Sequence, residues 1–198
     1  FNEFDILGSG KFTLATTGTI KITSVDGVNA DGNSTGNIQC AGSRTFSQTG
    51  YYHYVGSSTP QFTGTAMTSG STAKQIEINK TNATDIVNLT QNTGTTGFLK
   101  ISKGIFVESA TSGINGSGGL IIDTEGTYKI ALTGITVPQI SGTFTLSGNS
   151  TLELNGAGAQ ELRGSRSYRN LTFSNSGTKT LSWAITGANT ITGTVTIK

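Results

Sequence analysis

The chain contains few of the residues on which metal-binding and nucleophilic sites most often depend. Its 198 residues include one cysteine, Cys40, and one histidine, His53. A single cysteine excludes a disulfide framework within the chain, so we expect Cys40 to be an inert buried thiol. With one histidine we expect neither a histidine-based metal site nor a Ser–His–Asp triad.

Charge is also scarce. Charged residues make up 12% of the chain, about half the roughly 25% of ordinary soluble domains, and the net charge is +2. So weak and scattered a charge does not attract nucleic acid. No apolar run approaches the roughly 20 residues of a membrane-spanning helix. We therefore expect neither a nucleic-acid partner nor membrane insertion.

The abundant features are glycine, threonine and short alternating runs. The chain has 28 glycines and 35 threonines, a composition that excludes a helical bundle, a coiled coil and a nucleotide-binding α/β fold. Apolar and polar residues alternate in six clear runs, at residues 18–23, 74–79, 97–102, 128–133, 150–155 and 193–198. Alternation with a period of two indicates half-buried strands. We expect roughly 15 strands and essentially no helix.

Blocks of sequence recur in the same order along the chain. Residues 54–62 align with 154–162, 73–80 with 168–175, 87–90 with 179–182, and 97–101 with 193–197. Such self-similarity predicts an array in which each unit buries its apolar face against the next. The short strands and glycine-rich corners favour a β-solenoid (parallel β-helix) over tandem antiparallel β-sandwich domains.

The predicted solenoid is one continuous segment over residues 1–198. Within it we expect a partial repeat at 1–50, a repeat unit at about 51–104, linking rungs at about 105–149 and a second unit at about 150–198. The chain opens and closes within strand patterns and shows no polar cap. We therefore expect it to be a segment of a larger protein, stacked on neighbouring segments or on further copies in a homo-oligomer or filament.

The second unit resembles a known family. It reads Gly-x-Gly-x-Gln-x-Leu at residues 156–162, then Tyr-x-Asn-Leu-x-Phe-Ser-x-Ser-Gly-Thr-Lys-Thr-Leu at 168–181. This pattern is similar to the repeats of very large Bacteroidetes-type surface proteins, which leave the cell by the type 9 secretion route and include gliding and attachment adhesins. The resemblance implies a non-catalytic extracellular stalk or filament segment at the cell surface. The motifs are structural, so the resemblance carries over no catalytic residue.

Two patches are candidates for ligand binding, if the chain is instead a carbohydrate-binding module. Alternation places Tyr52 and Tyr54 on one strand face, where exposed rings would stack on sugars and buried rings would fill the core. Arg163, Arg166 and Arg169 form the one basic cluster, beside a tyrosine. They could hold an anionic polysaccharide, or they could form an ordinary solvated corner.

Acidic residues suggest two further sites. Asp26 and Asp31 lie in a loop rich in glycine and asparagine, which is either a calcium site or a plain turn; we expect no other cofactor. Asp123 and Glu125 are two residues apart and are the one candidate pair for a polysaccharide-active enzyme. The remaining acids, such as Glu77, look isolated, so we expect an outer solvated face and no enzyme.

Pairs of threonines two residues apart raise the possibility of an ice-binding face. They occur at Thr63/Thr65, Thr143/Thr145, Thr178/Thr180 and Thr192/Thr194/Thr196. Ice binding requires turns of constant length so that threonines align, and these spacings are irregular. The strand propensity of threonine is the simpler interpretation.

Overall fold

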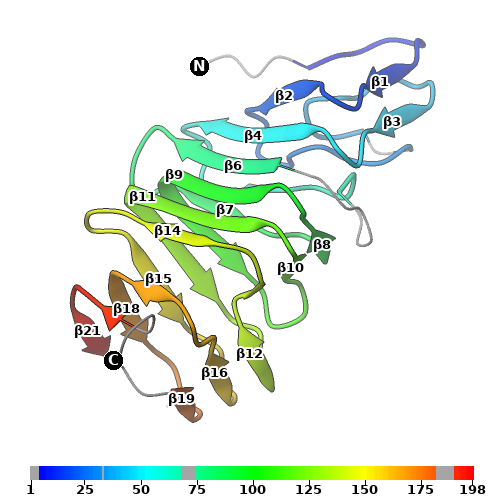
Figure 1. Cartoon of the computed structure of the whole chain (residues 1–198). Helices are drawn as coiled ribbons and strands as arrows, with labels where there is room; N and C mark the ends of the chain where they lie inside the picture. Colours follow the sequence, from blue (N-terminus) through cyan, green and yellow to red (C-terminus); the bar gives the residue numbers. More distant parts are fainter. Residues whose placement is uncertain (1–4, 33, 68–74, 182–189) are drawn as a thin grey trace.

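The computed structural model describes residues 5–32, 34–67, 75–181 and 190–198. Every regular element in these residues is a β-strand, and every pairing between the strands is parallel. The strands wind into a β-solenoid of about six turns, with the first strands at one end and the last at the other (Figure 1). The predicted solenoid is therefore confirmed, and the antiparallel sandwich alternative is wrong.

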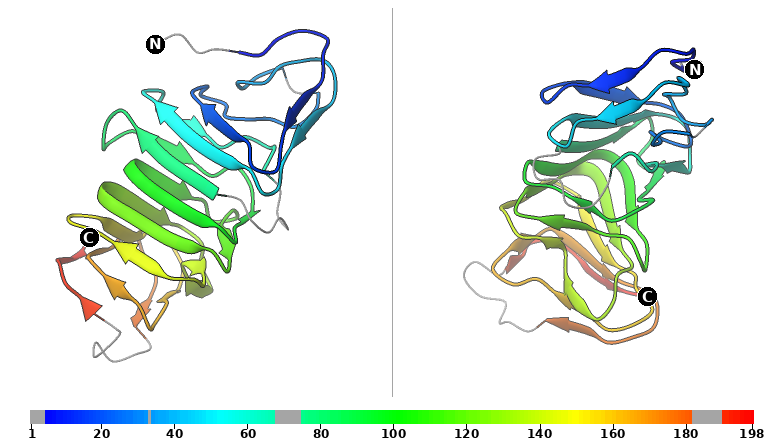
Figure 2. Two further views of the ribbon diagram at one scale, coloured as in Figure 1. Left: turned by 45° about the horizontal axis from the view of Figure 1, so that its top comes forward. Right: turned by 90° about the vertical axis from the view of Figure 1, so that its right-hand side faces the viewer.

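The first column of stacked strands runs along most of the solenoid. It consists of β2 (Thr19–Ile22), β4 (Tyr51–Gly56), β6 (Gln75–Lys80), the first halves of β9 (Phe98–Glu108) and β11 (Gly119–Ile130), and β14 (Phe144–Leu146). Tyr51 pairs with Gln75 and Gln75 pairs with Phe98, so a turn takes 23 or 24 residues here. Figure 2 shows the turns piled along one axis.

A second column stands beside the first, around a corner. It consists of β5 (Gln61–Phe62), β7 (Ile86–Asn88), the second halves of β9 and β11, β15 (Thr151–Leu154), β18 (Asn170–Phe173) and β21 (Val195–Ile197). Strands β9 and β11 run through this corner, where Gly104 pairs with Gly126. Gly104 has a φ of +105°, and a Cβ on Gly126 would meet the carbonyl oxygen of Ile101 in the turn before. Glycine therefore lets both strands bend while the turns stay in contact.

Shorter strands complete each turn. One short column contains β8 (Thr93–Gly94), β10 (Ile114–Gly116) and β13 (Gln139–Ile140). Another contains β12 (Ile135–Val137), β16 (Gln160–Leu162) and β19 (Lys179–Leu181). Two separate pairs are β1 (Phe12–Leu14) with β3 (Arg44–Phe46), and β17 (Ser167–Tyr168) with β20 (Thr190–Ile191).

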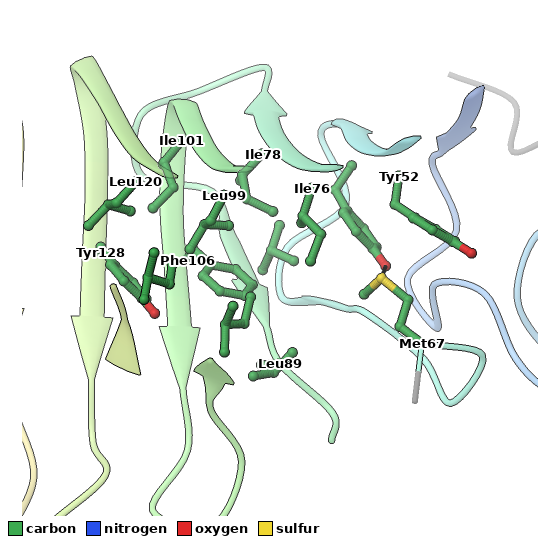
Figure 3. Packing of buried hydrophobic residues seen from close by; sticks show 14 of the residues in the cluster. Tyr52, Met67, Ile76, Ile78, Leu89, Leu99, Ile101, Phe106, Leu120 and Tyr128 are labelled. Carbon is green, nitrogen blue, oxygen red and sulfur yellow. Dashed lines mark hydrogen bonds between the residues drawn. The ribbon is translucent and has the colours of Figure 1, made fainter. Parts of the chain in front are cut away.

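The core is a file of inward side chains from successive turns. Figure 3 shows Tyr52, Ile76, Leu99 and Leu120 following one another along the first column, in the register of β4, β6, β9 and β11. All four are completely buried. Burying a large apolar side chain stabilises a fold by about 1.5–3 kcal/mol, so this file is the main source of stability.

The aligned sequence blocks occupy different columns of the solenoid. The described part of residues 73–80 lies in β6, in the first column, whereas residues 168–175 contain β18, in the second. Both columns require the same inward and outward alternation, so the sequence pattern does not distinguish them. The unit that the register defines is one turn, and the larger units with their boundaries stay a prediction.

Where the chain leaves a strand, side chains form the hydrogen bonds to backbone groups that a neighbouring strand would otherwise form. The Nε2 group of Gln160 donates to the carbonyl oxygens of Ile130 and Leu132 in the preceding turn, at 2.7 Å each. Its Oε1 accepts the N–H of Gly156 at 2.9 Å. The Nε2 group of Gln61 likewise donates to the carbonyl oxygens of Ile22 and Ser24, at 3.1 and 2.9 Å. Backbone groups that would be left unpaired at the corners are satisfied in this way.

Replacing Gln160 by leucine is expected to lower the free energy of unfolding by about 3 kcal/mol, because three backbone groups lose a buried partner. Gln139→Leu is the matched control: Gln139 is half-buried on β13 and forms no hydrogen bond through its side chain with the described residues. That control should stay within about 0.5 kcal/mol of the parent chain. Urea unfolding followed by circular dichroism measures both, and equal losses would contradict the bridging role of Gln160.

Candidate functional site

The two tyrosines proposed for sugar stacking lie inside the solenoid. Tyr52 and Tyr54 are both completely buried. The Tyr52 hydroxyl donates to the carbonyl of Ser47 at 2.6 Å, and the Tyr54 hydroxyl donates to that of Thr63 at 3.0 Å. Burial raises the pKa of both phenols above the usual range. The prediction that their rings contact a ligand is wrong, because this face of β4 packs into the core.

The opposite face of β4 contributes Tyr51 and His53 to a polar cluster on the outer surface. Tyr51 and His53 stack with ring centroids 5.8 Å apart and planes within 3°. His53 pairs in register with Glu77 of the next turn, and Glu77 pairs with Lys100 of the turn after. The ring of Phe98 meets Tyr51 edge-on, with centroids 5.9 Å apart. Three consecutive turns thus bring together side chains that lie about 24 residues apart in sequence.

Glu77 is the centre of this outer cluster. Its carboxylate accepts hydrogen bonds from the hydroxyls of Tyr51 and Ser102, the latter at 2.6 Å. Lys100 Nζ lies 3.4 Å from Glu77 and 3.6 Å from Asp123. Only 8% of Glu77 is exposed. These contacts come from side chains of the turns on either side, so Glu77 joins three successive turns.

His53 contributes no charge to the outer cluster at neutral pH. Burial lowers the pKa of its imidazole, and the nearby ammonium groups of Lys21 and Lys100 lower it further. Its Nε2 lies 3.8 Å from Glu77, too far for a hydrogen bond. The neutral ring therefore contributes to this cluster by stacking on Tyr51.

The expectation that the remaining acids are isolated is wrong. Glu153 of β15 lies 3.3 Å from Lys129 of β11, its partner in register. Opposite charges on neighbouring turns occur because parallel register sets residues of consecutive turns side by side. Sequence alone does not disclose this register, so the pairing was missed.

Asp123 and Glu125 do not form a joint acid–base site. A register shift between Ile122 and Glu125 separates them. Asp123 pairs with Lys100 at 3.6 Å, while Glu125 pairs with Lys103 at 3.0 Å. Each carboxylate is therefore held by a different lysine of β9, which removes the one pair of residues that favoured a polysaccharide-active enzyme.

A buried acid was missed by the sequence reasoning. Glu108 at the end of β9 is 1% exposed, and its Oε1 accepts the N–H of Ile114 at 2.7 Å and the hydroxyl of Tyr128. Its Oε2 has no partner among the described residues. Burial raises the pKa of Glu108 to about 7, although these two hydrogen bonds oppose the rise. Alternation from Phe106 would have placed Glu108 on the inward face.

The loop that contains Asp26 and Asp31 is held by hydrogen bonds between its own residues and Arg44. The carboxylate of Asp31 accepts the N–H of Arg44, whose guanidinium donates to the carbonyls of Cys40 and Ala30 at 3.1 and 3.2 Å. Asp26 is half-buried nearby. Within the described residues, which omit position 33 of this loop, no three or more His, Cys, Asp or Glu side chains gather in a way that could hold a metal ion. Cys40 is buried, as expected.

The three arginines do gather at one corner. Arg163 donates through Nε to the carbonyl of Pro138 at 2.8 Å, and Arg169 to that of Leu146 at 3.2 Å. Arg166 donates to Ser141 and lies over the ring of Phe144, 4.9 Å from its centroid. Each guanidinium therefore reaches back to the preceding turn.

The threonine pairs do not share a face. Thr145 lies in the first column, Thr180 on β19 and Thr196 in the second column, while Thr63 is buried. The described pairs therefore form no flat array of the kind that ice binding requires.

No helix long and apolar enough to cross a membrane occurs among the residues that the structure describes. Comparison of the chain with protein-family models, with curated proteins and with solved structures found no match.

Proposed function

We propose that this chain is a non-catalytic structural segment of a large secreted surface adhesin, working as part of an extracellular stalk or filament. The main support is that several of the buried and half-buried polar side chains form their bonds to the neighbouring turn. Glu77, Gln160 and Lys179 all bond across turns. A rod whose turns are joined in this way is stiff and offers few loose segments to proteases.

The composition of the surface supports an extracellular setting. Threonine, serine, asparagine and glycine dominate the chain, and only 12% of residues are charged. The resemblance of residues 156–181 to adhesin repeats points the same way and adds type 9 secretion and gliding or attachment as the context. The partners in this proposal are neighbouring segments of the same protein, stacked along the axis.

Removal of one whole turn tests the structural role. Phe98 and Gly119 are partners in register, so deletion of residues 98–118 would place β11 directly on β6. We expect the shortened chain to fold, the rod to shorten by about 4.8 Å, and attachment by the full-length protein to persist. Deletion of residues 98–108 removes half a turn and is the control, which should not fold.

Two results would contradict the proposal. One is loss of attachment or of a polysaccharide-degrading activity when the folded one-turn deletion is tested in the full-length protein. The other concerns location: antibodies against this chain should label intact cells, and labelling only after permeabilisation would exclude a surface stalk.

A further inference from the structure

The first column is interrupted between β14 and β17. β14 pairs with β11 on one side, and β17 pairs with β20. No backbone pairing among the described residues joins β14 to β17, although the rings of Phe144 and Tyr168 are 6.1 Å apart. The interruption leaves a hollow of about 270 Å³, lined by Phe144, Thr145, Leu146, Ser167, Tyr168, Arg169, Thr190 and Thr192.

Arginine side chains cross this interruption and retain unused donors. Arg169 uses Nε on the carbonyl of Leu146 and Nη1 on the hydroxyl of Thr192, both at 3.2 Å. Its Nη2 has no hydrogen-bond partner among the described residues. The Nε of Arg166 is also without a partner there, but it is buried and Arg166 does not line the hollow, so the free donor at the hollow belongs to Arg169. A guanidinium with free N–H groups at a hollow is suited to an oxyanion.

No carboxylate neutralises these cations. Lys100, Lys103 and Lys129 all form ion pairs with acids on neighbouring turns. In the described part of the chain neither Arg166 nor Arg169 forms one. Both guanidinium groups therefore keep their positive charge, on a chain whose net charge is only +2. Their charge is available to an external anion.

Hydroxyl groups line the rest of the hollow. The side chain of Thr145 is exposed and forms no hydrogen bond with the described residues, while Thr190 donates to Ser167 at 2.9 Å. The hydroxyls of Thr145 and Ser167 remain able to donate outward. The volume of the hollow is slightly below the roughly 300–1,000 Å³ of ordinary ligand pockets, which limits the occupant to one small ring.

We propose that the hollow between β14 and β17 binds one sugar ring bearing a carboxylate or sulfate. Arg169 holds the oxyanion, and the hydroxyls of Thr145 and Ser167 bond to the ring hydroxyls. Such a site would attach the side of the rod to an acidic polysaccharide. It is a binding activity beyond the proposed stalk function, and neither depends on the other.

Titrations followed by ¹⁵N–¹H correlation spectra test the site on the full chain. Glucuronate, glucose 6-sulfate, glucose and inorganic sulfate are added separately at constant ionic strength. We expect both acidic sugars to shift the amides of Thr145, Ser167 and Thr192, with a Kd of about 1 mM. Glucose should leave these amides unchanged, and inorganic sulfate should bind at least fivefold more weakly than glucose 6-sulfate.

Four variants identify the residues responsible. Arg169→Gln should weaken glucuronate binding at least tenfold, and Arg169→Lys, which keeps the charge, should weaken it less. Thr145→Val should weaken binding of the sugars and leave inorganic sulfate unaffected. Arg44→Gln is the matched control, because Arg44 also donates to backbone carbonyls but lies at the far end of the solenoid. It should not change any of these affinities.

Three outcomes would overturn the proposal. Equal binding of glucose and glucuronate would remove the role of the oxyanion. Binding of sulfate as tightly as glucose 6-sulfate would leave a site for a free anion and none for a sugar. Unchanged affinity in Arg169→Gln would exclude the hollow; if that variant does not fold, unchanged affinity in both Arg169→Lys and Thr145→Val excludes it.

Discussion

Gly116→Ala should lower the free energy of unfolding by about 3–5 kcal/mol. Gly116 lies on β10 with a φ of +123°, which L side chains rarely adopt. A Cβ at this position would overlap the carbonyl oxygen of Thr95 in the preceding turn. That carbonyl accepts the N–H of Gly118 at 3.0 Å, so the two turns cannot separate without losing a bond.

Two other glycines separate the causes of this loss. Gly134 has a φ of +74° but no atom within 4 Å of an added Cβ. Gly134→Ala therefore tests backbone strain alone, and we expect a loss of about 1 kcal/mol. Gly10 has neither strain nor a neighbour, and Gly10→Ala should be neutral. Urea unfolding measures the series; similar losses for Gly116→Ala and Gly134→Ala would show that close contact between turns is not the cause.

The second large effect is a fall in stability as pH rises, caused by Glu108. Its pKa is raised from 4.5 to about 7 by burial in the folded chain. Below pH 4.5 the carboxyl is protonated in both states and costs nothing. Above that pH the unfolded chain loses the proton first, so stability falls until about pH 7 and then levels. The shift corresponds to a loss of about 3 kcal/mol across this range.

Glu108→Gln should abolish this part of the pH dependence. Glutamine keeps an oxygen for the N–H of Ile114 and the hydroxyl of Tyr128 but does not ionise. Unfolding free energies of both chains are compared at pH 4, 5, 6, 7 and 8. The difference between them should change by about 3 kcal/mol in favour of the variant as pH rises.

Comparison with the parent chain matters because His53 acts in the opposite direction. Its lowered pKa means that the unfolded chain binds a proton more readily, so His53 favours folding as pH rises. This contribution is common to both chains and cancels in the difference. Glu125→Gln, which removes an exposed carboxylate, is the control for the loss of one negative charge elsewhere on the chain. A constant difference between Glu108→Gln and the parent would contradict the assignment.

The strands were predictable because alternation is a local property of the chain. The alternation within Tyr51–Tyr54 correctly placed Tyr52 and Tyr54 together on one face. Which face turns inward was not predictable, because all four residues are aromatic and show no contrast between apolar and polar faces. Packing against Ile22 and Ile78 decided it, since these register partners of Tyr54 lie in the core.

The polar contacts between turns were not predictable from local alternation. Glu77 looked isolated because its partners, Lys100 and Ser102, lie more than 20 residues away in sequence. Parallel register makes residues one turn apart into neighbours, and turn length depends on how many residues each corner takes. The arginine corner was recognised because its three residues lie close in sequence. The interruption between β14 and β17 was not recognised, because it depends on which strands pair in the folded chain.

The sequence by itself determined that this protein is built from short strands with turns rich in glycine. It favoured a solenoid over sandwich domains, and the parallel pairing in the structure decided between them. The strands and turns depend on the alternation and conformational freedom of residues that are adjacent in the chain. Only the tertiary structure decided which faces are buried, which charges meet across turns, and where the column of strands opens. A slip of the stack by one residue would preserve every local pattern and exchange all of these neighbours.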